Sequence, residues 1–209
     1  MPIIEKIEKS KHKQERVLVY LQEGDLLRIT EAELLRFGLY KGMALTEEQV
    51  GELRTAGARS ETRAAAARMA SGRMLSKKEL KNRLSRKGVE AQEAAETADW
   101  LEELGALDDS AYAGVIVRHY GTMGYGPGRV QQELFRRGIP RELWEDAMAQ
   151  LPPAREAIET YIRGKLRGRP ADAAAVKKLS DALLRRGFSR SDIRPAMQAL
   201  GQEISEEEP

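Results

Sequence analysis

A threefold internal repeat is the feature that most constrains how this 209-residue chain folds. One template consists of an apolar residue, three variable positions, a leucine, one variable position, two basic residues, a glycine and an apolar residue. It occurs over 80–89, 130–139 and 179–188. The three glycines are 50 and 49 residues apart. Periods of this length are typical of arrays in which each unit buries its apolar face against its neighbours.

Each copy of the template has the pattern of a helix end. Two basic residues suit the negative end of the helix dipole, and the glycine (Gly88, Gly138 or Gly187) suits the left-handed position after the last turn. Apolar periodicity predicts a preceding helix in each unit, over 61–71, 109–121 and 154–167. Pro140 and Ser189 mark the start of a following helix. The sequence therefore predicts a mainly α fold, a tandem array of three three-helix repeats that is elongated and curved.

The first part of the chain has a different pattern. Two β-branched runs, 17–21 and 26–29, flank a turn with Gly24 and predict a hairpin. Capping boxes that begin at Thr30 and Thr46 predict two short helices. Gly57 and Ser60 mark the end of this part of the chain. We expect a β-rich module with short helices over 1–58, helical repeats over 59–108, 109–152 and 153–202, and an acidic tail over 203–209.

Charge is segregated along the chain, although the formal net charge is only +2. Nine basic residues and one acidic residue over 63–88 give +8, eight acidic residues over 90–109 give −8, and residues 118–141 carry +4. Neighbouring helices of opposite charge form solvated faces whose pairs contribute about 0–1 kcal/mol each. A basic ridge that docks on phosphates or on an acidic protein surface explains the pattern equally well.

Composition and motifs exclude most catalytic sites. The chain has no cysteine and two histidines, so thiolate chemistry and a histidine-built metal cage are excluded. The glycine-rich segment 121–129 lacks the end of a phosphate-binding loop and fits a connection between helices, while Asp109 fits a helix cap. We expect no enzyme activity and no cofactor. Without a signal peptide or an apolar run of about 20 residues, we also expect a cytoplasmic protein with no membrane partner.

The ordered motifs resemble the RecX family of regulatory proteins, which are bacterial modulators of the RecA recombinase. The similarity covers 61–200 and extends to two N-terminal segments. The residues that carry it are Leu75–Leu80, Leu84, Arg86–Gly88, Leu101, Leu104, Gly105, Leu107–Asp109, Tyr112, Ala113, Arg118, Gly124–Pro127, Arg129, Val130, Glu133, Leu134 and Arg137–Ile139, with Arg16, Val17, Val19–Leu21, Phe37–Leu39 and Lys41–Met43 in the N-terminal part.

The resemblance implies a non-enzymatic protein that binds the RecA–DNA filament, and we expect it to be a monomer. The resemblance also implies inhibition of ATP hydrolysis, strand exchange and filament growth, in recombination, DNA repair and the SOS response. We expect the contacts at the basic pairs and at four further positions: Arg73, Arg86, Lys87, Arg118, Tyr125, Arg129, Arg136, Arg137, Arg185 and Arg186. The same basic residues are equally suited to the ends of their own helices. The alternative function is a helical protein that binds single- or double-stranded DNA directly.

Overall fold

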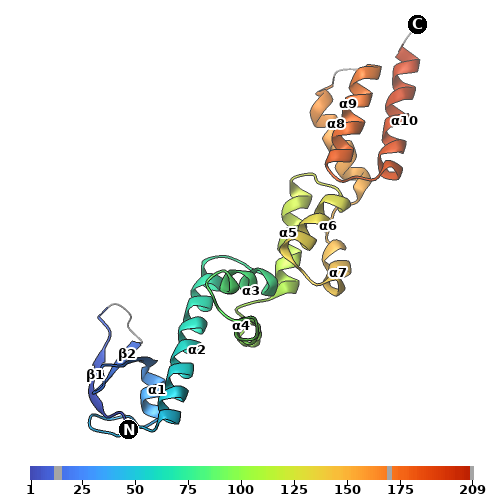
Figure 1. The fold of residues 1–209 in the computed structure, drawn as a ribbon. Helices are drawn as coiled ribbons and strands as arrows, with labels where there is room; N and C mark the ends of the chain where they lie inside the picture. The colour runs from blue at the N-terminus through green and yellow to red at the C-terminus, as the bar shows by residue number, and fades with distance from the viewer. Residues whose placement is uncertain (12–15, 169–170, 208–209) are drawn as a thin grey trace. The chain divides into compact units, whose positions relative to one another are not determined.

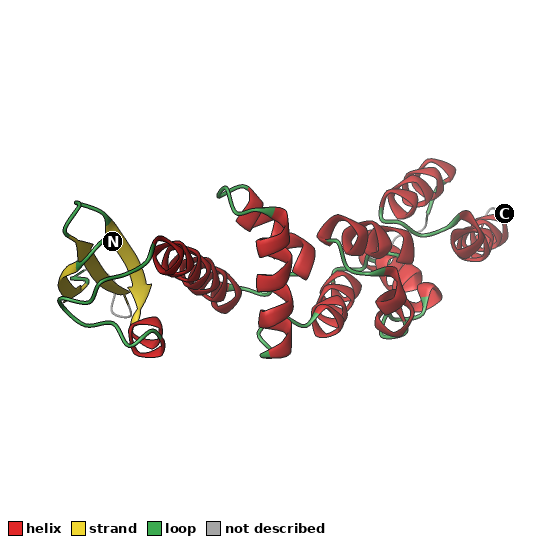
Figure 2. Cartoon of the chain, turned by 60° about the horizontal axis from the view of Figure 1, so that its bottom comes forward, coloured by secondary structure: helices red, strands yellow, loops and turns green. Residues whose placement is uncertain are grey.

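The computed structural model describes residues 1–11, 16–168 and 171–207, with side chains described as far as Leu200 (Figure 1). The chain divides into two compact units. Met1–Arg73 and Leu80–Ala106 form the first unit, and Met74–Glu79 and Leu107–Pro209 form the second. The strands gather in the N-terminal part of the first unit, and the remainder of the described chain is helical (Figure 2).

A three-stranded antiparallel sheet forms the N-terminal module. The strands β1 (Ile4–Lys9), β2 (Arg16–Leu21) and β3 (Leu26–Thr30) lie in the order β1-β2-β3. Alternate residues of β2 are buried, which follows from the two-residue period of a strand with one face on the core. The hairpin predicted from the sequence is confirmed, and Gly24 takes a φ of 88° in its turn. The remaining strand, β1, pairs along β2.

Both capping boxes are present. Thr30 begins α1 (Glu31–Arg36) and Thr46 begins α2 (Glu47–Gly72), with Glu33 and Gln49 as the reciprocal partners. The helix α2 is continuous, so the two helices expected at Thr46 and over 61–71 are one. It runs through the position after residue 58 at which the sequence suggested a boundary.

Packing against the sheet explains why α2 does not break at Gly57. A Cβ atom at this position would lie 2.0 Å from the carbonyl oxygen of Arg28 on β3. The glycine therefore allows the helix to approach the strand closely, with Val50 and Leu53 buried in the core of the module. Gly57 lowers the helix propensity locally, but its lack of a side chain allows α2 to lie closer to the sheet.

Eight further α-helices follow α2 in the described chain. They are α3 (Lys77–Ser85), α4 (Ala91–Glu103), α5 (Asp109–Thr122), α6 (Pro127–Arg137), α7 (Trp144–Met148), α8 (Ala154–Leu166), α9 (Ala173–Arg185) and α10 (Arg190–Glu207). The predictions over 109–121 and 154–167 are confirmed by α5 and α8. A short 3-10 turn, Arg141–Leu143, precedes α7, so the third helix of the second repeat is divided.

One expected helix cap is wrong, and one helix extends into the segment expected as a tail. The cap of α5 is Asp108, whose carboxylate accepts from the Ala111 N–H at 2.8 Å. Asp109, the expected cap, is buried and accepts from the Lys77 N–H at 3.0 Å. The acidic segment expected as a tail from residue 203 continues α10 as far as Glu207, and residues 208–209 lie outside the described residues.

The helix ends of the template are confirmed. Gly88, Gly138 and Gly187 have φ values of 85°, 72° and 87°, which is the left-handed region that glycine occupies without strain. The apolar residue after the glycine then packs back, and its backbone N–H reaches the leucine carbonyl of the template at 3.0 to 3.2 Å. Both repeats of the second unit close over aliphatic cores, one around Val130 and Leu134, the other around Leu179 and Leu183.

Candidate partner-binding surface

The template places two basic residues at the end of the second helix of each repeat, and the structure gives the two positions different environments. The first residue of each pair, Arg86, Arg136 or Arg185, is exposed. In the second position Lys87 is exposed, whereas Arg137 and Arg186 are half-buried. The six basic residues of the template therefore separate into half-buried side chains, which contact the rest of the fold, and exposed side chains, which are accessible to a partner.

Arg137 belongs to a buried polar network in the second repeat. Its Nε donates to Oε1 of Glu133 at 2.7 Å, and its NH1 donates to the hydroxyl of Tyr112. Glu79, on α3, lies 3.6 Å from the same NH1. These bonds hold together the ends of α3, α5 and α6, so Arg137 supports the fold of the second unit.

Glu133 is the acceptor at the centre of this network. Its side chain is only 3% exposed, and Arg136 donates to both of its oxygens, at 2.9 and 2.5 Å. Burial raises the pKa of the carboxyl, but the hydrogen bonds and charges of Arg136 and Arg137 outweigh it and lower the pKa to about 2. The guanidinium of Arg136, whose side chain is 68% exposed, still faces solvent while it is held in place.

Arg186 joins the third repeat to the glycine-rich segment of the second. Its NH1 donates to the carbonyl oxygens of Met123 and Gly124 at 2.8 and 3.0 Å. The guanidinium carbon also lies 5.1 Å from the ring centre of Tyr125 and 4.6 Å from that of Tyr161. Tyr125 and Arg186 are thus brought together, as parts of an internal contact.

The glycine-rich segment is a joint between repeats. The N–H groups of Gly126 and Gly128 donate to the carbonyl oxygens of Arg186 and Gly187 at 2.8 and 2.9 Å. Fifty residues earlier, the hydroxyl of Ser76 donates to the carbonyl oxygen of Arg137 at 2.5 Å. In both places the start of one second helix contacts the end of the next second helix. The segment thus connects two helices, as the sequence predicted, and also docks the following repeat.

Four expected contact residues have no hydrogen bond or ion pair from their side chains among the residues that the structure describes: Arg73, Arg86, Lys87 and Arg185. Arg118 donates to Gln150 at 2.5 Å, and Arg129 to Gln132 at 3.4 Å, and both remain exposed. Of the six, Arg73, Arg86 and Lys87 lie in the first unit and the others in the second. Within the described chain, no hydrogen bond or ion pair joins any of the six to another.

The segregated charges are partly used within the first unit. Glu96, in the acidic block, forms an ion pair with Arg59 on α2. Arg63, in the basic block, lies over the ring of Trp100 with 4.8 Å between the guanidinium carbon and the ring centre. These contacts attach α4 to α2. They leave Arg68, Arg73 and the pair at 86–87 exposed to solvent.

The contact residues expected from the sequence do not include Phe135, an exposed aromatic residue. Phe135, at the template position before the basic pair, is 64% exposed, and the ammonium of Lys78 lies 5.9 Å from its ring centre. The sequence contains one indication of this exposed residue, namely its position in the template. The corresponding residue of the third repeat, Leu184, is also apolar and only half-buried. Exposed aromatic and arginine side chains are enriched where proteins bind one another.

The described residues form neither a metal cluster nor a membrane-spanning helix. No group of three or more His, Cys, Asp or Glu residues that suits a metal ion occurs in the described ranges. No helix within those ranges combines the length and apolar character needed to cross a membrane.

Comparison with known proteins matches the helical repeats to one family. A model described as the first three-helix domain of RecX matches residues 63–101, and a model of the second three-helix domain matches 108–148. A crystal structure of a regulatory protein RecX has a TM-score of 0.74 and 25% identity, over 93% of this chain and 98% of that one. A crystal structure of RecX from Lactobacillus salivarius shares the fold with a TM-score of 0.61.

Curated relatives match over most of their length. A regulatory protein RecX from Bacillus licheniformis is 30% identical over 97% of this chain and 79% of the relative. One from Lactobacillus delbrueckii subsp. bulgaricus is 29% identical over 100% of this chain and 78% of its own. The protein of the same name from Xanthomonas campestris pv. campestris is 33% identical over 58% of this chain and 76% of its own. These matches and the shared fold show that the chain belongs to the RecX family of regulatory proteins.

Proposed function

We propose that this protein binds the RecA nucleoprotein filament in the cytoplasm and restrains ATP hydrolysis, strand exchange and filament growth, without catalytic activity of its own. Family membership supports the regulatory role, since the curated relatives are named regulatory proteins. RecA as the partner, inhibition as the outcome and the contact residues are our inferences.

The observation that carries the proposal is the exposure of the first basic residue in all three copies of the template. Arg86, Arg136 and Arg185 face solvent at intervals of 50 and 49 residues. A filament presents the same surface on successive subunits, so a chain with repeated contacts gains from engaging several subunits at once. Exposed cations also raise the rate of encounter with a negatively charged partner and orient it.

The proposal is tested by adding the full-length protein to RecA assembled on single-stranded DNA. We expect the rate of ATP hydrolysis to fall, the filaments seen by electron microscopy to shorten, and both effects to increase with concentration. A protein that leaves the ATPase rate and filament length unchanged at concentrations that saturate the filament does not have this function.

Direct DNA binding is the second candidate, because the same exposed cations suit phosphates. It predicts affinity for free DNA that falls steeply with salt, with a slope of roughly −0.7 to −0.9 in log–log form per phosphate contacted. If the protein retards free DNA strongly but leaves RecA filaments unchanged, the second function replaces the first. If the filaments respond at a salt concentration that abolishes binding to free DNA, the first holds.

A further inference from the structure

The third repeat contains an open groove between α9 and α10. Its volume is about 490 Å³, and all of its lining residues come from these two helices, among them Asp181 and Leu184 on α9 and Arg190, Ile193, Arg194 and Met197 on α10. The helices are joined by the short turn after Arg185 and lie side by side (Figure 1). The groove therefore belongs to one repeat, and its shape depends on one pair of helices.

The floor of the groove is apolar. Ile193 is 3% exposed and belongs to the core of the repeat, whereas Leu184 and Met197 are half-buried and pack against its edge. Leu184 occupies the template position at which the second repeat exposes Phe135. An apolar floor that opens to solvent gains free energy when an apolar side chain covers it, at about 25 cal/mol per Å² buried.

The rim of the groove is basic. Arg190 and Arg194 lie one turn apart on α10, both are exposed, and in the described part of the chain neither side chain forms a hydrogen bond or ion pair. Asp181 is the acidic residue opposite them on α9. Residues 154–200 carry eleven Lys or Arg and five Asp or Glu, so this segment of the chain has a net positive charge.

We propose that this groove binds an acidic amphipathic segment of a protein partner. Leucine-like side chains of the segment cover Leu184 and Met197, and its carboxylates face Arg190 and Arg194. A helix with apolar residues on one face and acidic residues beside them meets both requirements, as in other helix-in-groove complexes. Double-stranded DNA meets only one, because its phosphate backbone offers the arginines acceptors while its stacked bases leave the apolar floor uncovered.

The inference rests on the proposed function for which protein supplies the segment, but the chemistry of the groove does not depend on it. A synthetic probe tests that chemistry directly. We would use a fluorescein-labelled helical peptide of about four turns, with leucines at i and i+4 and glutamates on both sides. A second peptide, with lysine in place of every glutamate, controls for apolar binding alone. Binding to the full-length protein is followed by fluorescence anisotropy.

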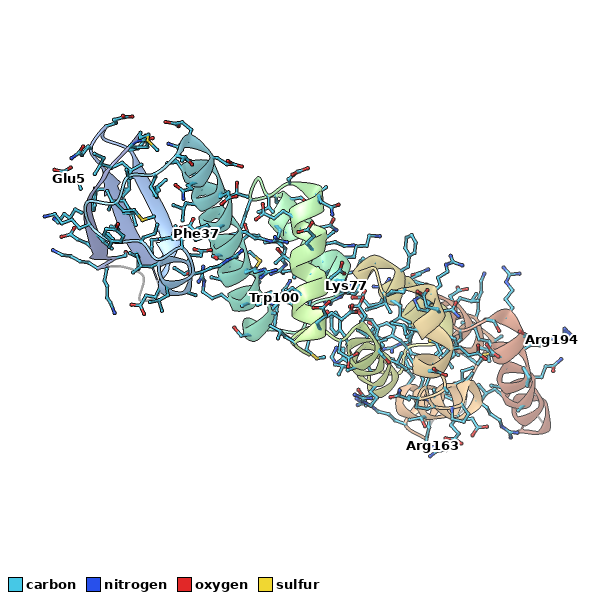
Figure 3. All side chains as sticks on the ribbon, turned by 90° about the horizontal axis from the view of Figure 1, so that it is seen from below. Glu5, Phe37, Lys77, Trp100, Arg163 and Arg194 are labelled. Atoms are coloured by element: carbon cyan, nitrogen blue, oxygen red, sulfur yellow. The ribbon has the colours of Figure 1, made fainter. Side chains whose placement is uncertain are left out.

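Arg194→Glu and Arg163→Glu form a matched pair of substitutions. Both side chains are exposed in the third repeat, and Figure 3 shows them projecting from different sides of it. We expect Arg194→Glu to weaken binding of the acidic peptide roughly tenfold and Arg163→Glu by less than about twofold, because only Arg194 lines the groove. The lysine peptide should not bind.

The apolar floor is tested by Leu184→Asn, with helicity and melting temperature checked by circular dichroism. Binding of the acidic peptide should weaken several-fold, while binding of a single-stranded oligonucleotide should not change. Equal losses for Arg194→Glu and Arg163→Glu, or competition by the oligonucleotide that depends on Arg194 but not on Leu184, would overturn the proposal. A normal effect on RecA without peptide binding refutes the groove alone. Peptide binding without an effect on RecA refutes the function alone.

Discussion

The backbone N–H of Gly126 donates to the carbonyl oxygen of Arg186 at 2.8 Å, across 60 residues of sequence. A Cβ atom at Gly126 would lie 2.6 Å from the Phe188 nitrogen and 2.7 Å from the Gly187 carbonyl oxygen. Two backbones therefore meet without an intervening side chain. The joint between the second and third repeats depends on the absence of a Cβ atom, since the φ of Gly126, −82°, is open to any residue.

We predict that Gly126→Ala lowers the free energy of unfolding by about 1–3 kcal/mol, because the methyl group forces the two backbones apart. Gly164→Ala is the matched control. Gly164 lies inside α8 with no atom within 4 Å of the added methyl group, so alanine should stabilise the protein by about 0.5–1 kcal/mol. Urea denaturation followed by circular dichroism measures both. Equal effects of the two substitutions would mean that the joint tolerates a side chain.

The network around Glu133 makes stability depend on pH. The pKa of this carboxyl is about 2 in the folded protein, whereas its ordinary value, which applies to the unfolded chain, is 4.5. Between these two pH values the unfolded chain therefore binds more protons than the folded protein. The stabilisation is therefore complete above about pH 4.5 and is lost as the pH falls towards 2. Its size is at most about 3 kcal/mol, on the order of 1.4 kcal/mol per pKa unit, and solvent around the exposed Arg136 reduces it further.

Glu133→Gln should remove most of this stabilisation at neutral pH and flatten the dependence of the urea midpoint on pH in the acid range. Glu145→Gln, at an exposed position of α7, controls for the loss of a charge and should preserve the acid limb. If Glu133→Gln keeps the acid limb of the wild-type protein, the stabilisation comes from another carboxyl.

The two arginines of the basic pair at 185–186 should contribute differently to the stability of the protein. Arg186→Ala removes two hydrogen bonds to carbonyl oxygens and two aromatic contacts, so we expect a loss of about 2–4 kcal/mol. Arg185→Ala, at the exposed neighbour, should change stability by less than about 0.5 kcal/mol. Thermal unfolding followed by circular dichroism compares them. Equal melting temperatures for the two variants would show that the contacts of Arg186 contribute nothing.

Local features of this fold could be predicted from the sequence, whereas contacts between distant residues could not. Helices with a strong 3.6-residue period and a glycine end, such as α6 and α9, could be predicted because their signals are local. The pairing of Glu133 with Arg136 and Arg137 also follows from i+3 and i+4 spacing. The contacts of Arg186 with Met123 and Tyr125 join residues about 60 apart, so no local pattern reveals them.

The continuity of α2 shows the opposite case, in which a local signal misled. Gly57 lowers helix propensity and indicates a break, but its close approach to Arg28 on β3 is favourable only when the helix is intact. Among the expected site residues, side-chain type could be predicted but environment could not. The environment of Arg137 and Arg186 depends in part on residues of the preceding repeat, Glu79 for the first and Met123 and Gly124 for the second.

Arg86 and Lys87 separate function from stability, because both are exposed and neither side chain has a hydrogen bond or ion pair in the described structure. We predict that Arg86→Glu with Lys87→Glu raises the concentration needed to halve the RecA ATPase rate by roughly tenfold and leaves the melting temperature unchanged. Lys11→Glu with Lys41→Glu makes the same change in net charge at exposed positions of the N-terminal module and should have little effect.

Arg136 and Arg137 are less informative sites for this test. Reversing their charge disrupts the bonds to Glu133, so a lost contact with the partner could not be distinguished from a lost fold. Full inhibition by the variant at 86–87 would remove this pair from the contact surface, and equal losses in both variants would reduce the effect to net charge.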